Sequence, residues 1–197
     1  MRFVDKTEHE MRMKIVRAAN KLMERDLLNE ISTAAICKEA GISRPTFYRY
    51  FADKFEIPQW HFELIASTYL YEIGRTLSWY EANYRNSLEV QKMRNFYIPA
   101  FKTEGFQSLV EHQRRRREEV PVETLTEYRG VKVDEELLFQ IRSHITAETD
   151  AVSKWVLSGM PYDAARLAEL IEGIIPRRLY ELLNQPHPSR MTSSFEL

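Results

Sequence analysis

The segment from Ile31 to Lys54 constrains the fold most strongly, because it is punctuated like two short helices joined by a tight turn. Ser32 or Thr33 can cap the first helix, since a short hydroxyl side chain accepts a hydrogen bond from the free N–H groups of an opening turn. Gly41 predicts the end of that helix, because glycine adopts the left-handed conformation without strain.

A second short helix is predicted directly after this turn. Ser43 is placed to cap it, and Pro45 falls in its first turn, where the missing N–H has no partner within the helix to lose. Phe47 and Phe51 are four residues apart and share one face, which we expect to be buried. The pattern is typical of a helix-turn-helix, whose second helix enters the major groove of DNA with its N-terminal residues nearest the base edges.

The run from Ala40 to Lys54, AGISRPTFYRYFADK, resembles the signature of the TetR family of transcriptional regulators. That signature combines a turn of type A-G-V-S, a T-(F/L)-Y-x-(Y/H)-F core and an x-(D/N)-K segment that opens the fourth helix. The resemblance is strong from Met11 to about Leu64, and beyond that it rests on helical pattern and length. The chain departs from the family at residues 26–30, where DLLNE replaces a region that usually contains a glycine.

The resemblance implies an all-α fold of about nine helices. A three-helix helix-turn-helix bundle is expected over residues 1–53, a helical effector-binding and dimerisation domain over residues 54–185, and a polar tail over residues 186–197. The scarcity of glycine, with 6 in 197 residues, also favours helices. The family's members are most often repressors that act as homodimers and are released from DNA by a small molecule.

Charge is divided along the chain in a way that suits DNA binding by its first part. The net charge of the whole chain is −1, but residues 1–55 hold 11 Lys and Arg against 8 Asp and Glu. A mildly basic head on an acidic body predicts nucleic-acid contact confined to the head.

Two kinds of DNA contact are expected, because phosphate contacts fix the register and base contacts specify sequence. Arg44 is the first candidate for base reading, since a guanidinium can bond both acceptors of guanine. The resemblance implies a backbone contact for Tyr48. Arg49 reads either a base or a phosphate, and Ser43 either bonds a phosphate or only caps its helix. The predicted DNA-contacting residues are Thr33, Ser43, Arg44, Pro45, Thr46, Tyr48, Arg49 and Lys54.

A dimer would place two recognition helices about 34–36 Å apart, one turn of duplex, so the expected partner is a palindromic double-stranded operator. The last two helices are joined by a short turn and are rich in apolar residues. The resemblance implies that they pair with those of a second copy, and the alternative is an ordinary helical hairpin buried in one chain.

The body is predicted to be helical with two proline interruptions. Pro58 falls inside the fourth helix. It either bends the helix in a way that transmits a ligand signal or causes only a harmless kink near the helix start. Pro176 is expected to bend the last helix. Helices are expected over about 77–95 and 98–117, a break over 121–132, a long amphipathic helix from Asp134, and a last helix over about 162–184.

Aromatic residues of the body are candidates for a ligand pocket, since pockets are mostly apolar with a few placed polar groups. An aromatic stripe at helical spacing is, however, more often core than pocket. The run from Arg114 to Arg117 is either a solvated helix end with local salt bridges or an anion site for an acidic effector. The candidate pocket residues are Trp60, His61, Trp79, Tyr84, Phe96, Tyr97, Phe101, His112 and His144.

The sequence offers no motif for catalysis, for a metal or for a cofactor, so no enzymatic activity is expected. Five scattered histidines and one cysteine give no metal-ligand spacing. The absence of a run of about 18 apolar residues predicts no membrane span. The charged N-terminal segment and the single cysteine, Cys37, suit a cytoplasmic protein, and Cys37 itself is expected to be a small buried hydrophobe.

Three functions follow from these patterns. The first is a DNA-binding regulator released by a small molecule. The second is a DNA-bound adaptor whose body recruits a protein partner, which predicts a packed body. The third is an enzyme or carrier with an incidental helix-turn-helix, which predicts that changes at Arg44 and Tyr48 leave function untouched.

Overall fold

The computed structural model describes residues 6–185, apart from the side chains of residues 104–109 and 112. Over this part of the chain the fold is all-α, with ten α-helices and no strand, so the predicted class is confirmed. The helices are α1 (Lys6–Leu22), α2 (Thr33–Ala40), α3 (Arg44–Tyr50), α4 (Glu56–Tyr69), α5 (Trp79–Lys92), α6 (Arg94–Ala100), α7 (Glu104–Glu123), α8 (Glu135–Leu157), α9 (Ala164–Glu172) and α10 (Arg177–Leu183), with a 3-10 turn η1 (Leu70–Glu72) and a π-helical turn η2 (Thr124–Tyr128).

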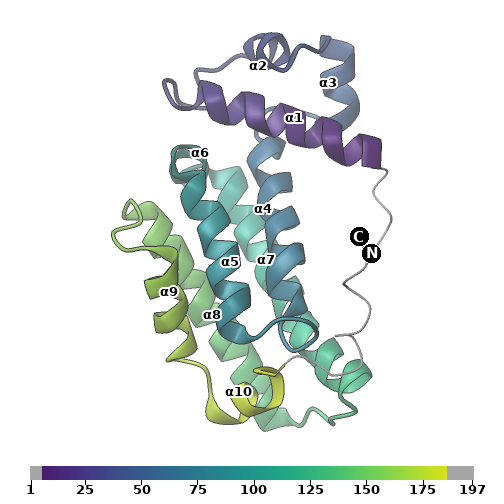
Figure 1. Ribbon diagram of the computed structural model, residues 1–197, viewed down its shortest axis with the longest axis vertical. Coiled ribbons are helices and arrows are strands. Elements are labelled where there is room, and N and C mark those ends of the chain that lie inside the picture. Colours follow the sequence, from purple (N-terminus) through teal and green to yellow (C-terminus); the bar gives the residue numbers. More distant parts are fainter. Residues whose placement is uncertain (1–5, 186–197) are drawn as a thin grey trace.

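The helices form a small head and a longer body (Figure 1). The head consists of α1, α2 and α3, and α1 lies across the upper end of α4. The body extends below it, with α4, α5 and α7 running alongside one another, α9 packed on α5, and α8 packed on α7. No helix in the described residues is both long and apolar enough to cross a bilayer. The predicted tail over residues 186–197 lies outside the described residues.

The helix-turn-helix forms as its sequence predicts. Ser32 caps α2 by accepting a hydrogen bond from Ala35 N at 3.1 Å. Gly41 takes the left-handed conformation, with φ 60° and ψ 44°, and ends that helix. Phe47 and Phe51 are both buried and bring α3 against α1. The position of α3 is therefore fixed by local capping and by one aromatic face.

The start of α4 is capped by the predicted carboxylates in a shifted arrangement. Asp53 Oδ1 accepts from Phe55 N at 2.7 Å and from Glu56 N at 3.1 Å. Glu56 Oε2 reaches back to Ala52 N at 2.7 Å, one residue earlier than a regular capping box requires. Pro58 occupies the first turn of α4, where a missing N–H costs little, so the harmless position is the one observed.

The predicted break over residues 121–132 is wrong in its first half. The α-helix continues through Pro121 to Glu123, and η2 extends the helical path to Tyr128. Val120, Thr124 and Leu125 are buried on this segment. Burial of this face outweighs the helix-breaking tendency of proline, and a π-helical turn follows it.

Two further predicted boundaries are corrected. The expected helices over 77–95 and 98–117 are three, because α6 forms a separate short helix between α5 and α7. The expected helix over 162–184 is not bent but divided into α9 and α10. Pro176 has ψ 132°, which is not helical, and the residue before a proline avoids the helical region. The helix beginning after Asp134 is confirmed, since Asp134 Oδ1 accepts from Leu137 N at 2.9 Å.

Two apolar clusters fill the interior. The upper cluster joins the head to the upper body, from Ile15 and Phe47 to Phe96 and Trp155. The lower cluster surrounds Trp79 and includes residues of α8 and α10. Buried polar side chains, including Asn86, Gln113, Arg117 and Glu148, line a cavity to which both clusters contribute apolar walls.

Candidate nucleic-acid interface and body cavity

The outer side of α3 is the candidate DNA-reading surface. Arg44, Pro45 and Arg49 are exposed, and Tyr48 is 56% exposed, while Phe47 between them is fully buried. Thr33 is half-buried at the first position of α2. The polar side chains that the sequence singles out therefore share the solvent-facing side of the head.

Hydrogen bonds within α3 bear on two predicted contacts. Ser43 Oγ accepts from Thr46 N at 3.2 Å and lies 2.8 Å from Thr46 Oγ1, so Ser43 caps its helix. Arg49 Nη2 donates to the hydroxyl of Tyr50 at 3.0 Å, which holds the guanidinium beside the neighbouring ring. A phosphate contact by Ser43 stays a prediction, and so does a contact of Thr46 with a thymine methyl group.

Lys54 has a structural role that the sequence did not indicate. Its Nζ donates to the backbone carbonyls of Asn29 and Ile31, both at 2.8 Å. These carbonyls belong to the loop between α1 and α2, where the chain departs from the family's usual glycine. Lys54 therefore holds that loop, and its predicted phosphate contact would use the remaining donor.

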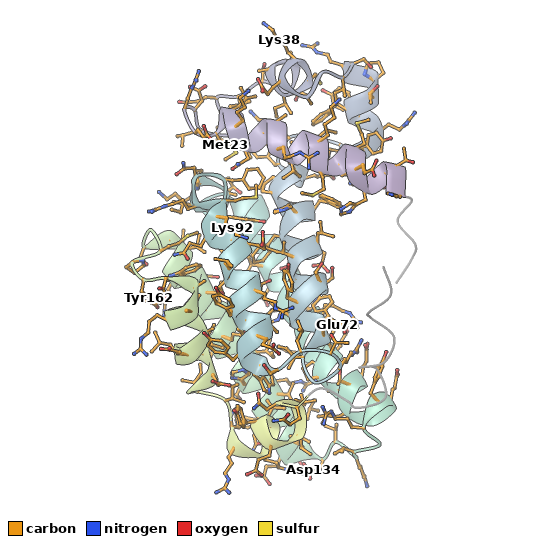
Figure 2. All side chains as sticks on the ribbon, viewed as in Figure 1. Met23, Lys38, Glu72, Lys92, Asp134 and Tyr162 are labelled. Atoms are coloured by element: carbon orange, nitrogen blue, oxygen red, sulfur yellow. The ribbon has the colours of Figure 1, made fainter. Side chains whose placement is uncertain are left out.

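Lys54→Ala is expected to lower the free energy of unfolding by about 1–2 kcal/mol, because two hydrogen bonds from a charged group are lost. A urea titration measures this loss. Lys38→Ala is the control, because Lys38 is an exposed lysine of α2 at the outer end of the head (Figure 2). Equal stability of the two variants would contradict the loop-holding role.

His61 and Tyr97, two candidate pocket residues, form a buried contact between α4 and α6. His61 Nδ1 lies 2.6 Å from the Tyr97 hydroxyl, and the rings are stacked with centroids 6.0 Å apart. Burial lowers the pKa of His61 to about 4 and raises the pKa of Tyr97 well above its usual value. The pair joins two helices of the upper core, so its environment favours a neutral imidazole.

His61 is expected to make stability depend on pH. Its pKa falls from 6.5 in the unfolded chain to about 4 in the folded one, so its contribution is complete above pH 6.5 and is lost as the pH falls toward 4. The expected loss between pH 7 and pH 5 is about 2 kcal/mol in the free energy of unfolding. His61→Gln should reduce the pH slope, and an unchanged slope in this variant would contradict the assignment.

The other candidate pocket residues lie mainly in packed regions. Trp60 packs edge-on against Phe51, with centroids 6.1 Å apart, at the junction of head and body. Trp79 packs edge-on against His144, with centroids 5.2 Å apart, in the lower part of the body. Phe96 is buried, Tyr84 stacks on Tyr80, Phe101 lines the cavity described next, and the side chain of His112 lies outside the described residues.

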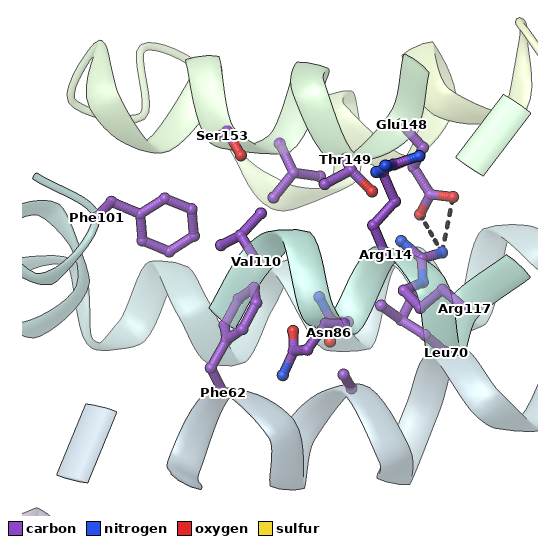
Figure 3. Close-up of a pocket in the computed structure, with 13 residues that line it drawn as sticks. Phe62, Leu70, Asn86, Phe101, Val110, Arg114, Arg117, Glu148, Thr149 and Ser153 are labelled. Carbon is purple, nitrogen blue, oxygen red and sulfur yellow. Dashed lines mark hydrogen bonds and ion pairs between the residues drawn. The ribbon is translucent and has the colours of Figure 1, made fainter. Parts of the chain in front are cut away.

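A cavity of about 30 Å³ lies inside the body, between α4, α5, α7 and α8 (Figure 3). One part of its wall is apolar and includes Phe62, Phe101 and Val110. The other part is polar and includes the side chains that the dashed lines in Figure 3 connect. The complete lining consists of Phe62, Ala66, Leu70, Asn86, Phe101, Val110, Gln113, Arg114, Arg117, Glu148, Thr149, Val152 and Ser153.

A buried ion pair forms the polar end of the cavity. Arg117 Nη2 donates to both carboxylate oxygens of Glu148, at 2.8 and 2.7 Å. Arg117 is 8% exposed and Glu148 is fully buried. His144 Nε2 lies 3.6 Å from Glu148 Oε2, and burial lowers the pKa of His144. The ion pair links α7 to α8 at the polar end of the cavity.

The arginine run therefore divides between two environments. Arg114 bonds Glu118 at 2.8 Å and also pairs with Glu111, and Arg116 pairs with Glu119 and Glu123. These local salt bridges match the solvated-helix interpretation. Arg117, in contrast, turns into the interior.

Sequence reasoning missed most of the cavity's polar residues, although one signal was present. On α8 the apolar positions Ile141, Ile145 and Val152 follow helical spacing, and Glu148 occupies the step between them. A charged residue on an apolar stripe indicates a buried partner. The partner, Arg117, lies on another helix. Its sequence position does not distinguish it, because it is one of four arginines in a row.

Comparison with known proteins agrees with the head and with the fold. Residues 15–57 match the profile of the family described as "Bacterial regulatory proteins, tetR family". No protein with a curated description matches the chain.

Three solved structures share the fold over most of the chain. "Dihydroxyacetone kinase operon activator DhaS" has a TM-score of 0.68 and 18% identity, covering 89% of this chain and 98% of that chain. A TetR-family transcriptional regulator from Streptomyces coelicolor has a TM-score of 0.52 and 20% identity, covering 84% and 78%. The regulator FadR from Bacillus subtilis, in complex with stearoyl-CoA, has a TM-score of 0.55 and 15% identity, covering 87% and 97%. Residues 15–57 thus carry a helix-turn-helix like that of the tetR family of bacterial regulatory proteins, and the described chain shares its fold with solved structures that include a TetR-family regulator.

Proposed function

We propose that the chain binds a palindromic operator as a homodimer, and that a small molecule entering the body cavity releases it from DNA. The observation that carries the first half is the division of α3, which buries Phe47 and exposes Arg44, Tyr48 and Arg49. The second half is supported by the cavity and by the neighbour solved with stearoyl-CoA. DNA reading requires the compartment that holds the DNA, so the proposed location is the cytoplasm.

The proposed domain boundary lies between residues 53 and 54, and the proposed dimer interface lies on α8 and α9. Phe139 of α8 is 71% exposed, and Leu170 of α9 and Ile174 just beyond it are also exposed. Large exposed apolar side chains of this kind suit contact with a second copy. α9 packs on α5 through its opposite face, which buries Leu167.

Helix α4 is the proposed connection between cavity and head. Phe62 and Ala66 of α4 line the cavity, and Trp60, two residues before Phe62, contacts Phe51 at the C-terminal end of α3. A ligand that widens the cavity would move α4 and change the spacing of the two recognition helices. One spacing fits one turn of DNA, so the ligand must bind the DNA-incompetent state more tightly.

The first experiment is a selection of bound duplexes from a random or genomic pool, with the protein's mass measured by light scattering. A palindromic site bound by a dimer is the expected result. Folded, dimeric protein that enriches no sequence would contradict the operator proposal under those conditions.

Arg44→Ala is expected to cost about 1–3 kcal/mol of specific binding and to relax sequence preference at one base position, because a bidentate base contact is lost. Binding to the selected operator and to random DNA is compared at one salt concentration. Arg85→Ala, at an exposed arginine of α5 outside the proposed dimer interface, is the matched control. Equal losses on both DNAs after Arg44→Ala would contradict base reading by this residue.

A second candidate function is the DNA-bound adaptor, whose body recruits a protein. The small size of the cavity favours it, because about 30 Å³ leaves the body almost fully packed. The neighbour described as an operon activator also suits a regulator that is not released from DNA. Ala66→Val, which fills the cavity, should abolish effector response under the first proposal and leave regulation unchanged under the second.

A further inference from the structure

Two buried polar atoms line the cavity without protein partners. Among the described residues, none hydrogen-bonds to Asn86 Oδ1 or to Thr149 Oγ1. Asn86 is 4% exposed, and both residues belong to the cavity wall, Asn86 from α5 and Thr149 from α8. An unmade hydrogen bond at a buried polar atom destabilises the fold, so each such atom is a candidate to bond a ligand or a water molecule.

The charges around these two atoms are already compensated. Arg117 is held by both oxygens of Glu148, and Arg114 is held by Glu118 and Glu111. His144 has a pKa lowered by burial, which favours its neutral form.

Glu63, whose carboxylate bonds the cavity residue Gln113, is also satisfied. Glu63 accepts from Gln113 Nε2 at 2.6 Å and from the Tyr71 hydroxyl at 3.0 Å. Over the side chains that the structure describes, the cavity thus presents no buried cation in excess of its carboxylates. An anionic ligand would have to compete with Glu148 for Arg117, and a cationic ligand would have to compete with Arg117 for Glu148.

We propose that the effector is a neutral, largely apolar molecule whose single polar end hydrogen-bonds to Asn86 and Thr149. Its apolar end packs against Phe62, Phe101 and Val110, and its polar end is a hydroxyl or a similar group that both donates and accepts. An ionised isostere is rejected because its charge would be buried without a partner. This inference rests on the proposed release by a small molecule and specifies the chemistry of that molecule.

The effector must make its own space. A volume of about 30 Å³ holds roughly two water molecules. A ring-sized ligand therefore displaces the side chains of Phe62 and Phe101, which stand 5.5 Å apart between centroids. Since Phe62 is on α4, this displacement acts on the helix that reaches the head.

Benzyl alcohol, benzoate and benzylamine test the proposal, because they share one ring and differ in charge at neutral pH. Each is titrated into the full-length protein, and binding is measured from the shift in melting temperature. Benzyl alcohol is expected to stabilise the protein, and the two ions are expected to bind roughly a hundredfold more weakly or less. Tighter binding of benzoate or benzylamine, or no shift with benzyl alcohol up to millimolar concentration, would overturn the inference.

Two variants, Thr149→Val and Asn86→Leu, test whether these side chains bond the polar group of the ligand. Each variant is expected to weaken benzyl alcohol binding about five- to tenfold, since one hydrogen bond is removed without loss of volume. Thr68→Val, at an exposed threonine of α4, is the control. Unchanged affinity in both cavity variants would overturn the assignment.

Operator binding is measured in the same samples without any probe. Loss of selective DNA binding in the unliganded protein would contradict the proposed function itself, whereas a wrong charge preference with intact DNA binding contradicts this inference alone.

Discussion

Glu148→Leu is expected to lower the free energy of unfolding by about 3–5 kcal/mol, because it leaves the Arg117 guanidinium buried without its carboxylate. Arg117 is only 8% exposed, so water cannot readily replace the two hydrogen bonds that its Nη2 donates to Glu148. Urea denaturation, followed by far-UV circular dichroism, measures the loss.

The double variant Arg117→Met, Glu148→Leu separates the two contributions to this cost. Replacing both partners by apolar residues of similar size is often neutral or stabilising, so stability should return to near the wild-type value. Such a recovery would show that the unpaired charge, and not the change in packing, destabilises the single variant. A double variant as unstable as Glu148→Leu would contradict this explanation.

The head could be predicted almost residue by residue because its determinants are local. Ser32, Gly41 and Ser43 act on backbone groups within four residues of themselves, and Phe47 and Phe51 share a face by helical spacing alone. Such signals are complete within a short stretch of sequence. The partners of Lys54 escaped prediction because they lie 23 and 25 residues away, on a loop whose path the sequence does not specify.

The cavity could not be predicted because it is assembled from five separate parts of the chain. Arg117 and Glu148 are 31 residues apart, and their meeting depends on how α7 packs on α8. Most of the aromatic residues that suggested a pocket pack in the two apolar clusters, as an aromatic stripe at helical spacing usually does, and only Phe101 among them also lines the cavity. The helix through Pro121 shows the same limit, since burial of its neighbours overrides a local breaking signal.

Phe47→Ala is expected to lower the free energy of unfolding by about 3–5 kcal/mol and to abolish operator binding with it. The ring is fully buried, lies 6.1 Å from Phe51 between centroids, and belongs to the apolar cluster that continues from the head into the upper body. Because that cluster is continuous, we expect the Phe47→Ala substitution in the head to destabilise the whole chain, which should unfold in a single transition.

The neighbouring residue supplies the matched control. Tyr48→Phe keeps the ring of a side chain that is 56% exposed, so stability should change by less than about 0.5 kcal/mol. The affinity of the protein for operator and for random DNA should fall about five- to tenfold in both cases, since the Tyr48 hydroxyl is assigned to a phosphate.

Hydrogen exchange tests the continuity of the core. If Phe47→Ala accelerates exchange only in α1, α2 and α3 and leaves the body at its wild-type rates, the head unfolds by itself. A motion of α4 would then reach the recognition helix through the few contacts at Trp60 rather than through a shared core.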